Sequence, residues 1–291
     1  MSYEIKKATI KDNNGINKII QDVYGPDDFI HNQIMIWLED TKNFYPLVAI
    51  DSKSQNYMGF TNNRILGDYL WIEGLRVAPN YRNKNLATEL IKHSISYSLR
   101  NRKKIIGYAT GDGNTPMHKI GLELGFSLIG EQYVINKRLL TDNPDKKDIK
   151  SYQTIIDKGQ FYDLLMNKYN NQIYVAFFKI PDNHEGGKML DNIPIFETEN
   201  YYFLHEIIHG EATRSRGIFT IFLKKSLEPD KIIEELHLIE EYAQPYNYER
   251  LTIALMKKEI KNEEIFDQML KQENYDRHTL HFFEKKLLND K

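Results

Sequence analysis

The sequence predicts a mixed α/β protein made of two consecutive domains. Short segments rich in β-branched and aromatic residues alternate with amphipathic helical segments along the chain. The strand-helix-strand-helix-strand order that ends the first half returns at the end of the second half, and a polar stretch separates the halves. We therefore expect domains at 1–140 and 152–291, joined by a linker at 141–151.

Composition limits the class of protein. The 291 residues are 41% hydrophobic, which is enough to bury sizeable cores, and the net charge of −2 predicts no broad attraction to nucleic acids or membranes. The absence of cysteine excludes disulfides, thiol nucleophiles and thiolate metal sites. The start lacks an apolar signal region and no apolar run reaches membrane-spanning length, so we expect a cytoplasmic protein.

The first half predicts the element order β-α-α-β-β-β-α-β-α-β. Alternating side chains predict its strands, helical spacing of apolar residues predicts its helices, and Gly125 marks the end of the last helix. The expected strands are 3–8, 44–51, 57–65, 69–77, 104–110 and 133–137. The expected helices are one capped by Thr9 or Asp12 that runs to residue 23, then 29–38, one that begins at residue 86, and 115–124.

The second half predicts elements with the same periodicities. The expected order is a helix at 152–167, strands at 172–180, 201–209 and 218–224, a helix at 230–242, a strand at 250–257, a helix at 263–272 and a strand at 278–285.

The stretch 69–90 carries the clearest functional signal. A strand ends at Val77-Ala78-Pro79, a basic turn follows, and an amphipathic helix begins at Leu86. Backbone N–H groups at a helix N-terminus lack partners within the helix, and the helix dipole makes that end positive. With Arg82 and Lys84 beside it, the turn suits a phosphate; an ordinary basic turn is the alternative.

This stretch resembles the acetyl-CoA-binding motif of the GNAT superfamily of N-acetyltransferases, which reads R/Q-x-x-G-x-G/A after a strand. Here it reads Arg82-x-x-Asn85-x-Ala87, with Asn85 where the family usually has glycine. Asparagine tolerates left-handed backbone better than most residues, so the motif is weakened and not lost. The segment NTPMHKIGLELGF at 114–126 is similar to the family's N-x-x-helix-G-F pattern. These resemblances imply a GNAT fold with a central mixed sheet, and the repeated order suggests a degenerate GNAT-like second copy.

A narrower resemblance is to the vertebrate histidine N-acetyltransferase family. Those enzymes have D-x-Y-G, W-L-x-D-T and E-G-L-R-V-A-P in this order, and the chain has DVYG at 22–25, WLEDT at 37–41 and EGLRVAP at 73–79. They also carry a second domain. The resemblance implies transfer of an acetyl group from acetyl-CoA to the α-amine of an amino acid, with histidine as the reference acceptor.

The GNAT resemblance also implies which residues bind the donor. The backbone of Leu75 and Val77 should pair with the pantetheine arm like another strand, and an N–H there would stabilise the developing oxyanion. The basic turn should hold the pyrophosphate. The expected acetyl-CoA-binding residues are Leu75, Arg76, Val77, Arg82, Asn83, Lys84, Asn85, Leu86, Ala87, Asn114 and His118, and no metal is expected.

Direct transfer needs a neutral amine that faces the thioester. A free α-amine has a pKa of about 8, so a modest base suffices. Simple alternation places Glu73 on one face of its strand with Trp71, Leu75 and Val77. GNAT enzymes often hold the base on this strand, which makes Glu73 the candidate base. The alternative is a carboxylate paired with a Lys or Arg.

A general acid for the leaving thiolate is less evident. Many GNAT enzymes have a tyrosine where this chain has Gly121. Tyr108, Tyr133 and His118 are candidate substitutes, with structural roles as the alternative. Because the CoA thiolate is a fair leaving group, the reaction does not strictly require an acid.

The acceptor is expected beside the first two helices. Tyr24, Asp28 and Phe29 lie in their connection, where a carboxylate and two rings can hold an amine-bearing, ring-containing ligand. A capped helix start with an apolar staple is the alternative.

One motif in the second half points to a different chemistry. His205-Glu206-Ile207-Ile208-His209 matches H-E-x-x-H, which binds zinc when it is helical. The strand-like composition of 201–209, and Gly210 directly after it, oppose a helix. The counterpart of the basic turn, KKSLEP at 224–229, has no glycine or arginine, so we do not expect this half to bind acetyl-CoA well.

Several functions are therefore open. The first is a small-molecule N-acetyltransferase that needs an amine acceptor and no nucleic-acid or membrane partner. The others are a protein or peptide N-acetyltransferase, an inactive acyl-CoA-binding protein, and a zinc metallopeptidase through His205, Glu206 and His209.

Overall fold

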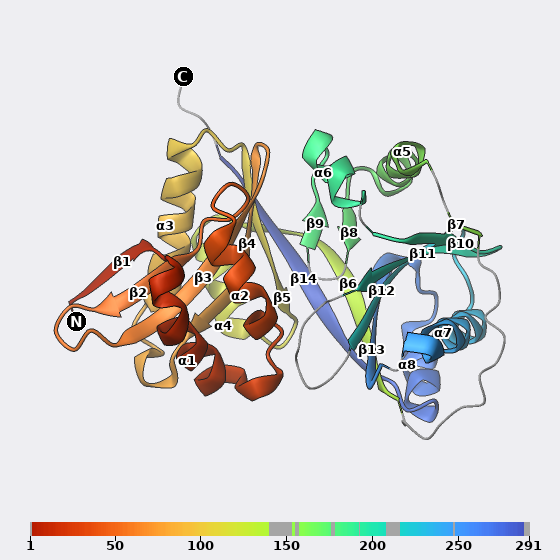
Figure 1. Cartoon of the computed structure of the whole chain (residues 1–291). Helices are drawn as coiled ribbons and strands as arrows, with labels where there is room; N and C mark the ends of the chain where they lie inside the picture. Colours follow the sequence, from red (N-terminus) through yellow and green to blue (C-terminus); the bar gives the residue numbers. More distant parts are fainter. Residues whose placement is uncertain are drawn as a thin grey trace. The chain divides into compact units, whose positions relative to one another are not determined.

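The computed structural model describes residues 2–139, 153–154, 157–175, 178–191, 193–207, 216–246 and 248–287. Its contacts divide the chain into two compact units (Figure 1). Unit 1 comprises Met1–Thr110, Asn114–Leu128 and Phe282–Lys291, and unit 2 comprises Gly111–Gly113 and Ile129–His281. The predicted mixed α/β class is confirmed, whereas the expected linker at 141–151 lies outside the described residues.

Unit 1 is built on a mixed sheet with the strand order β1-β2-β3-β4-β5. The first four strands pair antiparallel, and β5 runs parallel to β4. The strands are β1 (Tyr3–Lys7), β2 (Leu47–Asp51), β3 (Tyr57–Leu66), β4 (Tyr69–Val77) and β5 (Ile105–Gly111).

Helices cover both faces of this sheet. One face, which we call the α1/α2 face, packs against α1 (Asn13–Tyr24) and α2 (Ile30–Glu39) through a core that includes Trp37 and Phe60. The other, the α3 face, packs against α3 (Leu86–Arg100) and α4 (Thr115–Glu123) through Leu70, Ile72 and their neighbours. The expected helices and strands up to residue 124 are thus present, with ends shifted by a few residues.

The end of unit 1 differs from the expected arrangement. The strand expected at 133–137 is β6 (Ser127–Arg138), which belongs to unit 2 from Ile129 onward. Unit 1 contains instead the end of β14 (Asp276–Lys286), whose Phe283 joins its core and whose Glu284 accepts a 2.8 Å hydrogen bond from Tyr69. Local periodicity predicts that a strand exists but not which sheet it joins, because pairing depends on distant residues.

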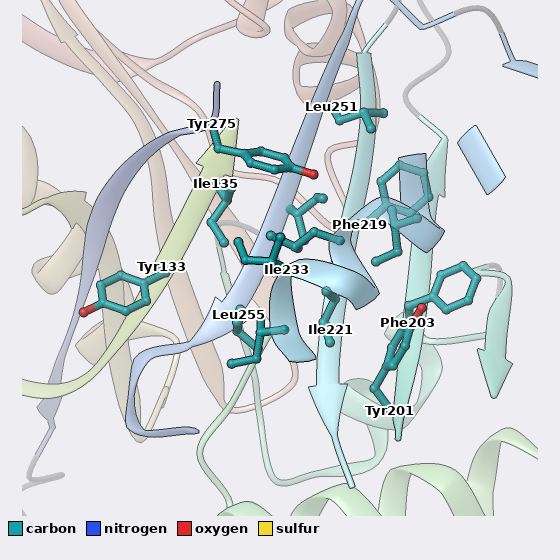
Figure 2. Close-up of a cluster of buried hydrophobic side chains, with 14 of the residues drawn as sticks. Tyr133, Ile135, Tyr201, Phe203, Phe219, Ile221, Ile233, Leu251, Leu255 and Tyr275 are labelled. Carbon is teal, nitrogen blue, oxygen red and sulfur yellow. The ribbon is translucent and has the colours of Figure 1, made fainter. Parts of the chain in front are cut away.

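The sheet strands of unit 2 follow the order β14-β6-β13-β12-β11-β10-β7. The pair β12 (Arg216–Leu223) and β13 (Arg250–Met256) is parallel, and β11 (Tyr201–Ile207), β10 (Ile195–Glu197) and β7 (Gln153–Thr154) follow antiparallel. The helices α7 (Pro229–Ala243) and α8 (Glu263–Gln272) bury an aromatic and aliphatic core against one face (Figure 2).

Several elements of unit 2 differ from expectation. The helix expected at 152–167 is α5 (Lys158–Tyr169), and residues 153–154 form a strand instead. The segment expected as one strand at 172–180 forms two antiparallel strands, β8 (Ile173–Val175) and β9 (Phe178–Ile180). Neither α6 (His184–Met189) nor β10 was expected, because both are too short to show a period. In the described part of the chain, no helix is long and apolar enough to cross a membrane.

Candidate functional site

The parallel strands β4 and β5 pair only at their beginnings. Tyr69–Ile72 pair with 105–108, and within the described residues the remainder of β4, Glu73–Val77, has a partner strand only on the β3 side. This leaves backbone N–H and C=O groups of β4 available along the edge that faces β5. Leu75 and Val77, the residues expected to pair with pantetheine, lie in this stretch.

The basic turn leads directly into α3, beside the end of β4. Asn85 adopts the left-handed conformation with φ 59°, which is the geometry that the family's glycine supplies. Its side chain does not cap α3, so the first N–H groups of the helix, from Leu86 onward, receive no side-chain cap from it. The turn is exposed: Arg82 donates to the Val77 carbonyl at 3.3 Å, and Lys84 to the Asn80 carbonyl at 2.8 Å.

A β-bulge at Gly74 changes which side chains share a face. One residue of β3, Thr61, lies opposite two residues of β4, and Gly74 has φ +67°. Simple alternation would place Glu73, Leu75 and Val77 together, and that expectation is wrong. Leu75 and Val77 pack on the α3 face with Leu86 and Leu90, whereas Glu73 remains on the α1/α2 face.

Glu73 is held by two residues of β3. Asn62 Nδ2 donates to Glu73 Oε1 at 2.7 Å, and Arg64 donates to Glu73 Oε2 from Nε at 3.3 Å and Nη2 at 3.1 Å. Asn62 is fully buried, and its Oδ1 has no hydrogen-bond partner among the described residues. The pairing with an arginine, the structural alternative for Glu73, is therefore present, and it fixes the position of the carboxylate.

The bulge also turns Arg76 toward the α1/α2 face. Its Nε and Nη2 donate to the two oxygens of Asp28 at 2.9 and 3.2 Å, and its Cζ lies 4.4 Å from the centre of the Tyr24 ring. Two expected acceptor residues, Tyr24 and Asp28, are thus brought together with Arg76, which we expected to bind the donor. Phe29, the third, is partly exposed at the start of α2.

The remaining expected donor residues belong to α4. Asn114 caps this helix, because its Oδ1 accepts from the Met117 N–H at 3.4 Å and its Nδ2 donates to Thr110 Oγ1 at 2.8 Å. The His118 ring lies 5.4 Å from the Phe283 ring. Both residues thus have structural contacts in unit 1, and their roles toward acetyl-CoA stay predictions.

The candidate general acids are engaged in other contacts. Tyr108 is buried and donates to the Met117 carbonyl at 3.2 Å, and burial raises its pKa, so the hydroxyl stays protonated. A Cβ at Gly121 would lie 1.8 Å from the Tyr108 hydroxyl, which explains why a larger residue is absent there. Tyr133 lies in unit 2, where its hydroxyl donates to Glu263 and burial raises its pKa.

The zinc motif does not form the helix that it requires. His205 and Glu206 lie in β11 and pair with Phe219 and Ile218 of β12; His209 is outside the described residues. His205 is fully buried between the hydroxyls of Tyr242 and Tyr248, at 3.2 and 2.8 Å. Among the described residues, no cluster of three metal-ligating side chains occurs.

In the described part of unit 2, the parallel strands do not separate and the following helix has an acidic residue in its first turn. Its parallel strands β12 and β13 remain paired from Arg216↔Arg250 to Ile221↔Leu255. Its counterpart of α3, the helix α7, begins with Pro229 and has the acidic Asp230 in its first turn, where a phosphate would be repelled.

Sequence reasoning missed Asn62 and Arg64. Both lie in TNNR at 61–64, a polar run inside a strand that is otherwise apolar. A buried polar side chain needs a partner, so this run was a signal that a polar group on a neighbouring strand faces it.

Comparison with known proteins supports the resemblance of this chain to acetyltransferases of the GNAT family. Residues 14–126 match the acetyltransferase (GNAT) family. A GCN5-related N-acetyltransferase from Sphaerobacter thermophilus has a TM-score of 0.65 at 11% identity, covering 98% of this chain and 95% of that chain. A candidate acetyltransferase from Pyrococcus horikoshii has a TM-score of 0.60 at 13% identity, covering 99% and 91%. Another from Thermoplasma acidophilum has a TM-score of 0.55 at 12% identity, covering 99% and 100%.

These structural likenesses establish the fold over both halves of the chain. Among proteins of curated function, none matches the sequence. The narrower resemblance to histidine N-acetyltransferases stays a prediction. The family match covers residues 14–126, which is less than half of the chain, and the acetyltransferase (GNAT) family uses acetyl-CoA as its donor. The match supports an acyltransferase activity for this part of the chain.

Proposed function

We propose that unit 1 transfers an acetyl group from acetyl-CoA to the amine of a small molecule, the α-amine of an amino acid such as histidine. The observation that carries this proposal is the opening between β4 and β5. The unpaired stretch of β4 begins at Glu73, which binds Asn62 and Arg64 on the α1/α2 face, and ends at Val77, shortly before the turn that leads into α3.

The residues present fit the donor. The N–H groups of Leu75 and Val77 can pair with the pantetheine arm, as an added strand would. Their carbonyls accept from Arg76 Nη1 and Arg82 Nε, and each oxygen has a second lone pair for the amides of the arm. The N–H groups of the turn and of Leu86 and Ala87, with Arg82 and Lys84 beside them, suit the pyrophosphate. When bound, the donor supplies an acetyl thioester as the electrophile.

Glu73 is the proposed proton acceptor. The neutral amine attacks the thioester carbonyl, a C–N bond forms, the C–S bond breaks, and the amine proton passes to the Glu73 carboxylate. Asn62 and Arg64 keep that carboxylate at a fixed position, so it is already oriented when the acceptor arrives. The sulfur leaves as the CoA thiolate, which needs no residue to protonate it.

Substituting Glu73 by Gln tests the assignment. We expect kcat for thiol release from acetyl-CoA to fall on the order of 100-fold, because general base catalysis contributes this much. The dissociation constant for acetyl-CoA, measured by calorimetry, should stay unchanged, because the carboxylate lies on the face opposite Leu75 and Val77. Unchanged turnover in E73Q would remove Glu73 from the mechanism.

An inactive acyl-CoA-binding protein is the second candidate. The observation that favours it is that both oxygens of Glu73 already accept hydrogen bonds. Such a protein would bind acetyl-CoA as tightly as an enzyme and release no thiol with any acceptor. The two candidates therefore differ in turnover and not in donor affinity.

A further inference from the structure

The guanidinium of Arg76 is fixed in place by two contacts. Asp28, whose side chain is 2% exposed, accepts from Nε and Nη2, and this bidentate pair sets the plane of the guanidinium. The Tyr24 ring lies 4.4 Å from Cζ and so within cation–π distance. Arg76 itself retains 15% exposure, so its side chain is held without being sealed from solvent.

The hydrogen bonds of Arg76 leave some N–H donors of its guanidinium available. A guanidinium has five N–H donors. Within the described residues, its bonds use Nε, one donor of Nη2, and one donor of Nη1, which goes to the Leu75 carbonyl at 3.1 Å. One donor therefore remains on each terminal nitrogen, and these two donors are available to a carboxylate.

Arg76 and Glu73 are close enough to hold one small molecule. They lie on the same face of β4, three residues apart, which is at most roughly 10 Å of strand at about 3.3 Å per residue because the bulge at Gly74 lies between them. Two hydrogen bonds of about 2.8 Å each, plus the head group of an α-amino acid, cover a distance of the same order. An amine at Glu73 thus leaves an adjacent carboxylate within reach of Arg76.

We propose that Arg76 determines acceptor specificity by binding the carboxylate next to the reacting amine. The acceptor class is then α-amino acids, and amines that lack the carboxylate are poor substrates. This inference rests on the proposed acetyl transfer. Asp28 acts as a positioning residue, because its oxygens are used by Arg76 and by the Ile30 N–H at 3.2 Å.

A matched pair of acceptors tests the inference. The best amino acid from a screen of all twenty is compared with its decarboxylated amine, for example histidine with histamine. For the full-length protein we expect kcat/KM to favour the amino acid by about 100-fold, since hydrogen bonds to a charged group are involved. In R76Q, KM for the amino acid should rise until this preference falls below about fivefold. R76K keeps the positive charge but lacks the planar guanidinium that binds a carboxylate through two hydrogen bonds, so it should restore only part of the preference.

Arg64 provides the matched control, because it is a second guanidinium on this face and binds Glu73. R64Q should lower turnover of both acceptors by the same factor and leave the preference intact. Equal activity of the full-length protein on both acceptors would overturn the inference while acetyl transfer stands, and this readout requires no variant to fold. An equal loss on both acceptors in R76Q would also overturn it. Absence of turnover with every acceptor would instead overturn the proposed function, and this inference with it.

Discussion

At the scale of single residues, Asn62 is hard to explain by stability alone. Its side chain is fully buried, donates one hydrogen bond to Glu73, and leaves Oδ1 without a partner among the described residues. Burying an unsatisfied polar atom costs about 1–3 kcal/mol, which an apolar residue of similar volume would avoid. The benefit of the amide is therefore the fixed position of the Glu73 carboxylate.

Substituting Asn62 by Leu tests this explanation. We expect the melting temperature to stay the same or rise, because the unsatisfied oxygen is removed, while kcat falls about tenfold through loss of one charge-assisted hydrogen bond. The matched control is N63L, because the neighbouring Asn63 is equally buried and donates to the Tyr45 carbonyl instead. If N62L kept full turnover, Asn62 would have no part in positioning Glu73.

At the scale of elements, β4 shows what the sequence could and could not predict. The strand, the turn and α3 follow from composition and spacing, and Asn85 adopts the left-handed conformation that its place in the motif requires. The sequence does not predict which side chains of β4 share a face. The bulge at Gly74 depends on the pairing of β4 with β3, and it reverses the alternation of side chains after residue 73. The expected cofactor role of the Arg76 side chain is consequently unsupported by its contacts, which lie with Asp28 and Tyr24.

The strand β11 carries a buried histidine that responds to pH. Burial lowers the pKa of His205 to about 4 from its ordinary value of 6.5. Between these values the unfolded chain binds more protons than the folded chain, so the neutral histidine contributes stability that is present above about pH 6.5 and is lost as the pH falls toward 4. Urea unfolding of the protein at several pH values should show this loss.

The variant H205Q should show a smaller loss of unfolding free energy over the same pH range, because glutamine does not titrate. The exposed His93 on α3, substituted by Gln, serves as the control and should leave the pH dependence of the full chain in place. Equal pH dependence in H205Q and the unsubstituted protein would contradict a buried neutral His205.

At the scale of the whole molecule, the first domain is not continuous in sequence. The expected boundary at 140 rests on a polar stretch that lies outside the described residues, whereas unit 1 also contains the chain from Phe282 onward. Phe283 and Leu287 are buried in its core, and each such side chain stabilises the fold by about 1.5–3 kcal/mol. A chain-terminal strand that returns to the first unit is a long-range feature that local patterns do not contain.

A chain truncated at residue 140 should therefore fail to fold stably or to bind acetyl-CoA, although it includes the whole family match at 14–126. Thermal unfolding and calorimetric titration with acetyl-CoA measure this directly. The control is the same truncated chain with residues 276–287 attached through a flexible linker, which should regain binding. A truncated chain that binds acetyl-CoA like the full protein would show that β14 is dispensable for unit 1.

The most direct test of the central claim is free-thiol release from acetyl-CoA by the full-length protein, with each of the twenty amino acids and a few polyamines as acceptors. We predict saturable turnover with histidine or another amino acid and little with the polyamines. Tight acetyl-CoA binding without turnover on any of these acceptors would contradict a small-molecule acetyltransferase and favour a peptide acceptor or a binding protein. No acetyl-CoA binding at all would contradict the assignment of the β4–β5 opening as the donor site.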